Sequence, residues 1–306
     1  MEPYKNFGTL RMKQKGIIVF EQLRPKLMGI AYRFLGTVTD AEDIVQDVYL
    51  KWSAVNLSSI DNPEAWLKTV CARACLDVIK TVERKRCDYV GIWLPEPVQT
   101  VQESEFNFLE IDLEDSLTTA FILMLERLTP KERAAYLLYE IFDTAYVHIA
   151  KALDIQESAC RKLVSRAKMN IEKNKKRCTI SSEKQTQFLN AFKLAITEGK
   201  QSHLQTLLAK DIVIRADGGG KVTAILRAIT GIQPAIKFLV EDLKYFWQEF
   251  DWIETRINGN YGFIIKDNGS IHAVVSFEFN VIKQASEVFI IRNPDKMKSL
   301  ETTLIH

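Results

Sequence analysis

A chain of 306 residues has room for two or three domains with ordinary hydrophobic cores. Hydrophobic residues make up 47% and charged residues 26%, which is typical of a globular protein, and no apolar run is long enough to cross a membrane. The formal net charge of +2 excludes a uniformly basic nucleic-acid-binding protein, so any such surface must arise from local segregation of charge.

The N-terminal residues are polar and basic and lack the apolar core of a signal peptide, so we expect a cytoplasmic protein without membrane association. The cysteines show neither a CxxC pair nor a Cys/His metal spacing; they are Cys71, Cys75, Cys87, Cys160 and Cys178. Cys71 and Cys75 lie one helical turn apart, which favours plain core thiols. The sequence therefore predicts no metal site and no cofactor.

The first third of the chain is predicted to be helical. Apolar residues recur at helical spacing from residue 17 until Gly36, a residue type that commonly ends a helix. Thr39 or Asp40 can cap the next helix, and Pro63 suits the first turn of a third. The expected helices are 17–35, 40–54 and 63–86.

An acidic segment that contains prolines follows. From Asp88 to Glu126 the chain has nine acidic residues and no lysine or arginine. Within it, Trp93-Leu94-Pro95-Glu96-Pro97 has two prolines one residue apart, which cannot lie inside a helix. Residues 90–115 are therefore predicted to be a linker between domains.

Beyond the linker, the pattern fits a helix-turn-helix. Thr129-Pro130-Lys131-Glu132 is a helix-start signal with a threonine cap and a glutamate three residues later. Two further helices are predicted over 144–153 and 157–175, and in such motifs the start of the second helix enters the major groove of DNA. An amphipathic hairpin with a solvated basic face would give the same pattern. The outward residues of the second helix are Gln156, Ser158, Ala159, Arg161, Lys162, Ser165 and Arg166.

The last third of the chain is predicted to contain strands as well as helices. Helices are predicted over 184–208 and 231–245, and strands at Val213 and over 248–258, 261–266, 271–282 and 287–291. Asn258-Gly259 and Asp267-Asn268-Gly269 are hairpin-turn signals. Helices followed by an antiparallel meander indicate an α+β domain.

Several motifs together resemble a known family. The segments 40–52 and 65–77 resemble the polymerase-binding and promoter-melting helices of extracytoplasmic-function sigma factors, and 128–133 with the helix-turn-helix resembles their region 4. The segments 89–97, 217–221 and 293–297 resemble the subgroup that carries a fused SnoaL-like domain. The resemblance spans about 17–297. It implies region 2 over 1–89, a linker over 90–115, region 4 over 116–178 and a cone-shaped α+β SnoaL-like domain over 182–306.

The resemblance also assigns roles. It implies that core RNA polymerase binds an acidic surface formed by Asp40, Glu42, Asp43, Gln46 and Asp47. Promoter DNA near the minus-ten element would meet Asn56, Arg73, Lys80, Arg84, Lys85 and Arg86, and the helix-turn-helix would read the minus-thirty-five element. A contact between the C-terminal domain and the linker would involve Trp93, Pro95, Asp217, Lys221 and Asp295.

We therefore expect a sigma factor, not an enzyme, whose C-terminal domain acts in cis and has a possible small-molecule ligand in its apolar pocket. One alternative is a SnoaL-like cyclase or isomerase that uses an acid or base among His203, His272, Asp251 and Glu278. Another is a regulator that binds an operator without polymerase. For the Gly-rich segment 217–221, a flexible hairpin loop is the alternative to a contact.

Overall fold

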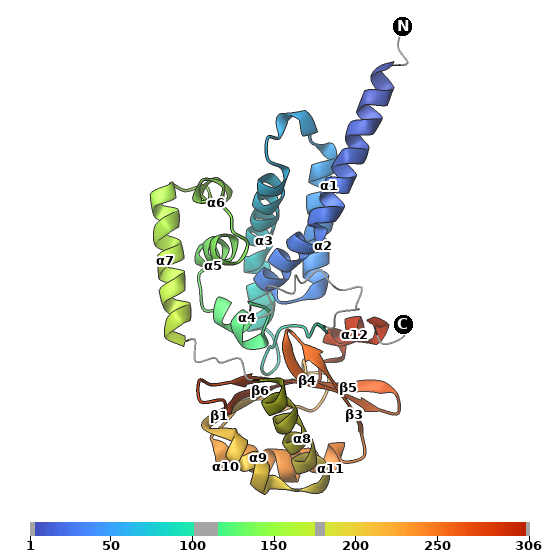
Figure 1. The fold of residues 1–306 in the computed structure, drawn as a ribbon, viewed down its shortest axis with the longest axis vertical. Helices are drawn as coiled ribbons and strands as arrows, with labels where there is room; N and C mark the ends of the chain where they lie inside the picture. The colour runs from blue at the N-terminus through green and yellow to red at the C-terminus, as the bar shows by residue number, and fades with distance from the viewer. Residues whose placement is uncertain (1–3, 101–115, 175–180, 304–306) are drawn as a thin grey trace. The chain divides into compact units, whose positions relative to one another are not determined.

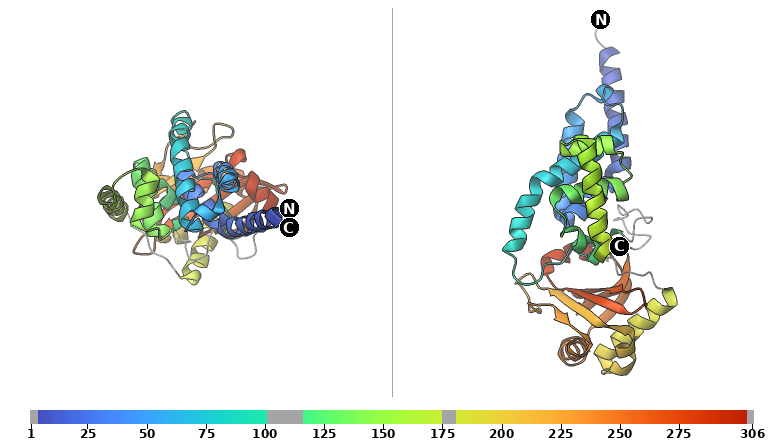
Figure 2. Two further views of the ribbon diagram at one scale, coloured as in Figure 1. Left: turned by 90° about the horizontal axis from the view of Figure 1, so that it is seen from above. Right: turned by 90° about the vertical axis from the view of Figure 1, so that its left-hand side faces the viewer.

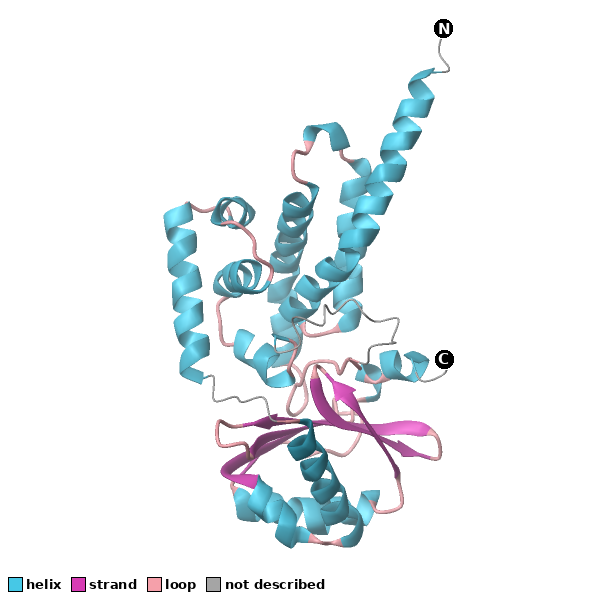
Figure 3. Ribbon diagram, in the orientation of Figure 1, coloured by secondary structure: helices cyan, strands magenta, loops and turns pink. Residues whose placement is uncertain are grey.

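The computed structural model describes residues 4–100, 116–174 and 181–303. These residues fall into two compact units. The first, which we call the helical unit, comprises 4–85, 116 and 122–174; the second, the sheet unit, comprises 86–100, 117–121 and 181–303. Figure 3 shows that the described strands all belong to the second unit. The expected fold class, helical domains followed by an α+β domain, is confirmed.

The N-terminal part of the helical unit consists of α1 (Tyr4–Leu35), α2 (Val38–Ala54), a short 3-10 turn (Leu57–Ser59) and α3 (Pro63–Cys87), whose last two residues belong to the sheet unit. Gly36 ends α1 at a positive φ of 73°, with its N–H donating to Tyr32 O. The buried face of α2 packs on α1, and the indole of Trp52 donates to Gly16 O at 2.8 Å. The cap of α2 is Thr37, and not the expected Thr39 or Asp40.

The second part of the helical unit is the helix-turn-helix segment. It contains the second half of α4 (Thr119–Leu125), whose residues 119–121 belong to the sheet unit, and then α5 (Pro130–Tyr136), the π-helix η3 (Leu137–Ile141), α6 (Tyr146–Leu153) and α7 (Glu157–Asn174). The predicted capping box is confirmed, because Thr129 and Glu132 each satisfy the other's backbone N–H. Asp154 occupies the turn between α6 and α7 in the left-handed conformation, at φ 52°. The π-helix was not predicted.

The described strands of the sheet unit form one sheet in the order β2-β1-β6-β5-β4-β3 (Figure 1). The strands are β1 (Leu208–Asp217), β2 (Ile229–Thr230), β3 (Asp251–Ile257), β4 (Asn260–Asp267), β5 (Ser270–Phe279) and β6 (Ala285–Ile291). Strands β3 to β6 form the predicted antiparallel meander, whereas β1 pairs with β6 in parallel. The sequence had indicated β1 only at Val213, because exposed Lys210 and Asp211 interrupt its apolar pattern.

Helices cover one face of this sheet (Figures 1 and 2). They are α8 (Ser182–Glu198), α9 (Gln201–Leu207), α10 (Ile232–Lys237), the π-helix η4 (Phe238–Leu243) and α11 (Lys244–Trp247). Gly199, at φ 79°, divides the single helix expected over 184–208 into α8 and α9. Aromatic side chains fill the core between helices and sheet; they include Phe188, Phe192, Trp247, Phe263 and Phe277. A 3-10 turn η5 (Pro294–Lys296) and α12 (Lys298–Thr303) follow β6.

Candidate DNA-binding and docking sites

The acidic residues of α2 lie on the side of the helix away from its core. Glu42, Asp43, Gln46 and Asp47 are exposed, whereas Ile44 and its apolar neighbours on the other face are buried. Asp40 is half-buried and accepts a hydrogen bond from Thr37 Oγ1 at 2.5 Å. Exposed carboxylates one turn apart on a rigid helix can bind a basic surface without rearrangement of the helix.

The basic residues of α3 divide between solvent and intramolecular partners. Lys80 and Arg84 are exposed, and the side chain of Lys85 lies outside the described residues. Arg73 is solvent-accessible, but its guanidinium donates to Ala152 O at 3.0 Å and to Lys151 O. Arg86 and Trp93 both belong to the sheet unit, and Arg86 stacks on Trp93 with 3.7 Å between the guanidinium carbon and the ring centroid. Helical spacing alone could not have separated Arg73 and Arg86 from the solvent-facing basic residues.

Asn56 has a local role in the loop before α3. Its side-chain oxygen accepts from Ser58 N at 3.2 Å and from Ser58 Oγ at 2.8 Å, so it caps the short 3-10 turn. Its amide nitrogen belongs to an exposed side chain. The loop therefore holds the exposed Asn56 amide on a backbone that these hydrogen bonds fix.

The helix-turn-helix has the expected outward face. Gln156, Ser158, Arg161, Lys162, Ser165 and Arg166 are exposed, and Ala159 is half-buried. Ile149, Leu153 and Cys160 are buried between α6 and α7. This packing fixes α7 on the rest of the segment and leaves its basic face accessible to a polyanion.

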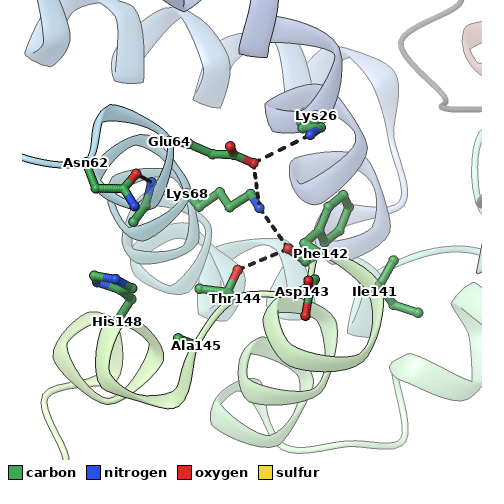
Figure 4. A pocket seen from close by; sticks show the side chains of 11 residues that line it. Lys26, Asn62, Glu64, Lys68, Ile141, Phe142, Asp143, Thr144, Ala145 and His148 are labelled. Carbon is green, nitrogen blue, oxygen red and sulfur yellow. Dashed lines mark hydrogen bonds and ion pairs between the residues drawn. The ribbon is translucent and has the colours of Figure 1, made fainter.

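Basic side chains join α1 and α3 to the helix-turn-helix segment through backbone carbonyls. Lys68, only 8% exposed, donates to Phe142 O at 2.7 Å, as Figure 4 shows. Arg133, 1% exposed, donates to Phe34 O at 2.9 Å, close to the end of α1. Arg73 binds carbonyls in the last turn of α6. Cations satisfy the free carbonyls at helix ends and suit the negative pole of the helix dipole.

A polar cavity of about 480 Å³ lies beside this contact. Its lining residues come from α1, the start of α3 and the segment that joins η3 to α6 (Figure 4). Glu64 binds Lys68 at 2.9 Å and Lys26 at 3.5 Å across it, and these cations hold the pKa of Glu64 below its usual range. The charged groups of the cavity thus largely pair with one another.

The sheet unit contains a site centred on Asp217, at the end of β1. This carboxylate is fully buried and accepts four hydrogen bonds. Tyr89 Oη donates to one oxygen at 2.5 Å and Gly219 N at 3.0 Å; Leu94 N donates to the other at 2.9 Å and Lys296 Nζ at 2.7 Å. We call Tyr89, Trp93, Leu94, Asp217, Asn293 and Lys296 the docking cluster, because they bind the segment after α3 to the sheet.

Lys296 is the cation of the docking cluster. Its ammonium also donates to Leu94 O at 2.5 Å and lies 4.5 Å from the Trp93 ring centroid. Burial lowers its pKa, although Asp217 opposes this effect. The pKa of the Tyr89 phenol is raised well above its usual range, first by burial and then by its hydrogen bond to Asp217. A buried ion pair, whose carboxylate accepts four hydrogen bonds, therefore holds the segment on the sheet.

The Gly-rich loop 218–221 meets the docking cluster at close range. Gly219 has φ 63°, and a Cβ atom there would collide with the amide of Asn293. A Cβ at Gly220 would lie 2.9 Å from Val90 Cβ. The structure thus places these glycines in contact with the segment after β6 and with the segment after α3. Both positions need glycine because a Cβ atom would collide with these segments.

The residues that the sequence names for the contact between the linker and the C-terminal domain differ in burial and in partners. Asp217 is central, Pro95 is buried and Trp93 is half-buried, whereas Lys221 and Asp295 form an exposed ion pair with each other. The sequence does not single out Tyr89, Leu94, Asn293 or Lys296, although all four lie in the segments 89–97 and 293–297. An aromatic hydroxyl, an amide and a lysine next to prolines and glycines are the signal that could have identified them.

Residues 98–100 extend this contact along the sheet. Val98 N donates to Asn258 Oδ1 at 3.0 Å, and Asn258 N donates to Val98 O at 2.8 Å. Asn258 is 1% exposed and also donates to Leu117 O at 3.2 Å. The described part of the expected linker is therefore part of the sheet unit, and so are residues 117–121, which the sequence assigned to region 4.

The candidate acid–base residues of the sheet unit differ in solvent exposure. His203 and Asp251 are exposed, and Glu278 is buried and accepts from Asn260 at 3.1 Å. His272 Nε2 lies 2.8 Å from Arg292 Nη2, so this nitrogen must be the acceptor and the ring neutral. Burial, and then the Arg292 charge, lowers the pKa of His272, while Asp267 has the opposite effect.

We expect this histidine to make the sheet unit less stable in mild acid. Below about pH 6.5 the unfolded chain binds a proton at His272, but the folded chain resists it until its lowered pKa is reached. The free energy of unfolding should therefore decrease as the pH is lowered through this window. Urea denaturation between pH 7.5 and 5 would show a flatter dependence for His272→Gln. His203→Gln is the control, and equal slopes for wild type and His272→Gln would contradict the expectation.

Within the described ranges, no group of three or more metal-ligating side chains comes together, and no helix is both long and apolar enough to cross a membrane. The described cysteines are free thiols, and Cys178 lies outside the described residues.

This chain is similar to sigma factors in family models, in sequence and in structure. A family model of sigma-70 region 2 matches residues 19–85, and one of sigma-70 region 4 matches residues 118–171. The ECF RNA polymerase sigma factor SigJ of Mycobacterium tuberculosis is 33% identical over 72% of this chain and 71% of its own length. The SigJ crystal structure matches with a TM-score of 0.72 at 29% identity, covering 92% of this chain and 98% of the SigJ chain. A probable sigma factor SigI from the same species is 32% identical over 60% of this chain and 63% of its own length.

Proposed function

Because the chain belongs to the extracytoplasmic-function RNA polymerase sigma factors, we propose that its C-terminal domain regulates transcription initiation in cis by binding the segment between region 2 and region 4. The observation that carries this proposal is the docking cluster. Its buried Asp217 binds Tyr89 and Leu94, which follow region 2 directly. A regulator that binds this segment influences how the two DNA-binding regions can be spaced on a promoter.

We infer that the partners of a sigma factor, core polymerase and promoter DNA, bind different faces of region 2. The exposed acids of α2 suit a basic surface of polymerase. Lys80 and Arg84 on α3, with Asn56 in the preceding loop, are proposed to contact opened promoter DNA, where unstacked bases meet a basic surface. Arg73 would join them only after it leaves the carbonyls of α6.

In region 4, we propose that α7 enters the major groove at the minus-thirty-five element. Arg161, in the second turn, is proposed to read a base, and Arg166, further along, is proposed to bind phosphate; both side chains are exposed. The exposure of both side chains and the buried packing behind them support this assignment.

The covalent connection makes regulation in cis efficient. A domain tethered by a short linker has an effective concentration on the order of millimolar, so even a weak contact is mostly occupied. The acid at the centre of the docking cluster has all its acceptor positions used by the four donors described above. This supports a structural role for Asp217 rather than acid–base chemistry. A small-molecule ligand for this domain stays a prediction, and aromatic side chains fill its core.

Transcription in vitro tests the regulatory role. Trp93→Ala removes the ring on which Arg86 and Lys296 stack, and cation–π contacts of this kind contribute about 0.5–2 kcal/mol. We expect a decrease of roughly 2- to 30-fold in the equilibrium constant for docking and a changed transcript yield from genomic DNA with core polymerase. Trp93→Phe, which keeps a ring, is the matched control. An unchanged yield from Trp93→Ala, with the fold intact, would contradict the proposal.

A further inference from the structure

Two tyrosines form a platform beside the start of the recognition helix. Tyr139 lies in the π-helix η3, and Tyr146 is the first residue of α6. Their rings stack with centroids 4.2 Å apart and planes inclined by 22°. Tyr146 is half-buried, and Tyr139 is 36% exposed. A stacked pair of this kind presents a ring face that cannot rotate freely.

Arg161 of α7 lies on this ring face. Its guanidinium carbon is 4.3 Å from the Tyr146 ring centroid, and Nη2 is 3.4 Å from the Glu157 carboxylate one turn earlier. The Arg161 side chain is nevertheless 60% exposed. An exposed arginine otherwise samples many rotamers, and ordering it opposes binding. The ring and the carboxylate limit this freedom while much of the guanidinium stays accessible.

The π-helix fixes the platform on the recognition helix. Phe142 N donates to Leu137 O at 3.1 Å, which is the wider hydrogen bond of a π-turn. Glu140, the neighbour of Tyr139, binds Lys168 Nζ at 3.1 Å, two turns beyond Arg161 on α7. The segment that carries Tyr139 is thus attached to α7 itself. Single π-turns inside helices occur often at functional sites.

We propose that Tyr146, backed by Tyr139, is a positioning residue that sets promoter specificity by presenting Arg161 to a base edge in the major groove. This rests on the proposed role of α7 at the minus-thirty-five element. The base that suits an arginine held in one plane is guanine, which offers two acceptors to a bidentate guanidinium. Glu157 restrains the same group through its carboxylate, at 3.4 Å.

A randomised minus-thirty-five library, transcribed by the full-length protein with core polymerase, tests the proposal. Arg161→Ala should relax preference at one position, by roughly 5- to 150-fold for a lost base contact. Tyr146→Leu should relax preference at that same position by about 10-fold, whereas Tyr146→Phe keeps the ring and should keep the wild-type profile. The double variant Arg161→Ala with Tyr146→Leu should show no further loss, because both act through one contact.

The outcomes separate this inference from the function on which it rests. If Arg161→Ala changes no position, the base-reading role proposed for α7 fails. If Arg161→Ala is position-specific but Tyr146→Leu leaves the profile unchanged, or lowers transcription equally on all sequences, the positioning role is overturned. Should Tyr146→Leu unfold, Tyr139→Leu provides the second test: a smaller loss at the same position supports the platform, and a wild-type profile overturns it.

Discussion

Replacing Asp43 and Asp47 with lysine is expected to weaken binding to core polymerase by at least about 100-fold, because juxtaposed like charges cost several kcal/mol at an interface. Both side chains are exposed and lie one turn apart on α2, while Ile44 and Val48 between and beside them remain buried. The change therefore reverses the charge of a surface and leaves the helix packing as it is. Co-purification with core enzyme at physiological salt is the measurement.

A matched control reverses two acids elsewhere. Glu241 and Asp242 are exposed on η4 of the sheet unit, so lysine at both positions produces the same change in net charge. This variant should bind core polymerase as wild type does. Equal binding by the Asp43/Asp47 variant and its control would show that polymerase uses another surface, although membership of the sigma family would stand.

Asp217→Ala is expected to lower the free energy of unfolding of the sheet unit by about 3–5 kcal/mol, the usual effect of removing one partner from a buried ion pair. The Lys296 ammonium would stay buried without its carboxylate, and Tyr89 Oη and Leu94 N would lose their acceptor. Urea denaturation followed by tryptophan fluorescence measures the change, since Trp247 and Trp252 lie in this unit.

Two further variants make that result specific. Asp295→Ala removes the exposed pair with Lys221 and should cost no more than about 1 kcal/mol. Combining Asp217→Ala with Lys296→Met removes the stranded charge and should recover part of the loss. In transcription assays, Asp217→Ala and Trp93→Ala should be non-additive if they disrupt one contact. If Asp217→Ala costs as little as Asp295→Ala, the docking cluster does not hold the segment.

Features set by local chemistry could be predicted from the sequence. The capping box at Thr129 and Glu132 needs only the two residues and the spacing between them, and the helix-turn-helix follows from apolar periodicity. Hairpin turns at Asn258-Gly259 and Asn268-Gly269 follow from residues that accept positive φ, and both asparagines adopt it. In each case a few neighbouring residues determine the conformation.

Features set by distant partners could not be predicted from local patterns; the contact of Asp217 with the linker was expected only from the family resemblance. Asp217 and Lys296 are 79 residues apart, and nothing in either local pattern names the other. The parallel pairing of β1 with β6 and the burial of Arg133 against Phe34 O have the same origin. Arg73 and Arg86 look like solvent-facing basic residues in the sequence, because the carbonyls and the indole that bind them lie elsewhere in the chain.

The basic side chains that join region 2 to region 4 use acceptors that substitution cannot remove. Lys68, Arg73 and Arg133 all donate to backbone carbonyls, which are present whatever residue occupies Phe142, Ala152 or Phe34. Substitutions at these three positions therefore leave the acceptors of the contact in place. A contact built on such acceptors tolerates sequence divergence on the accepting side, and its persistence depends on the three basic residues that donate the hydrogen bonds.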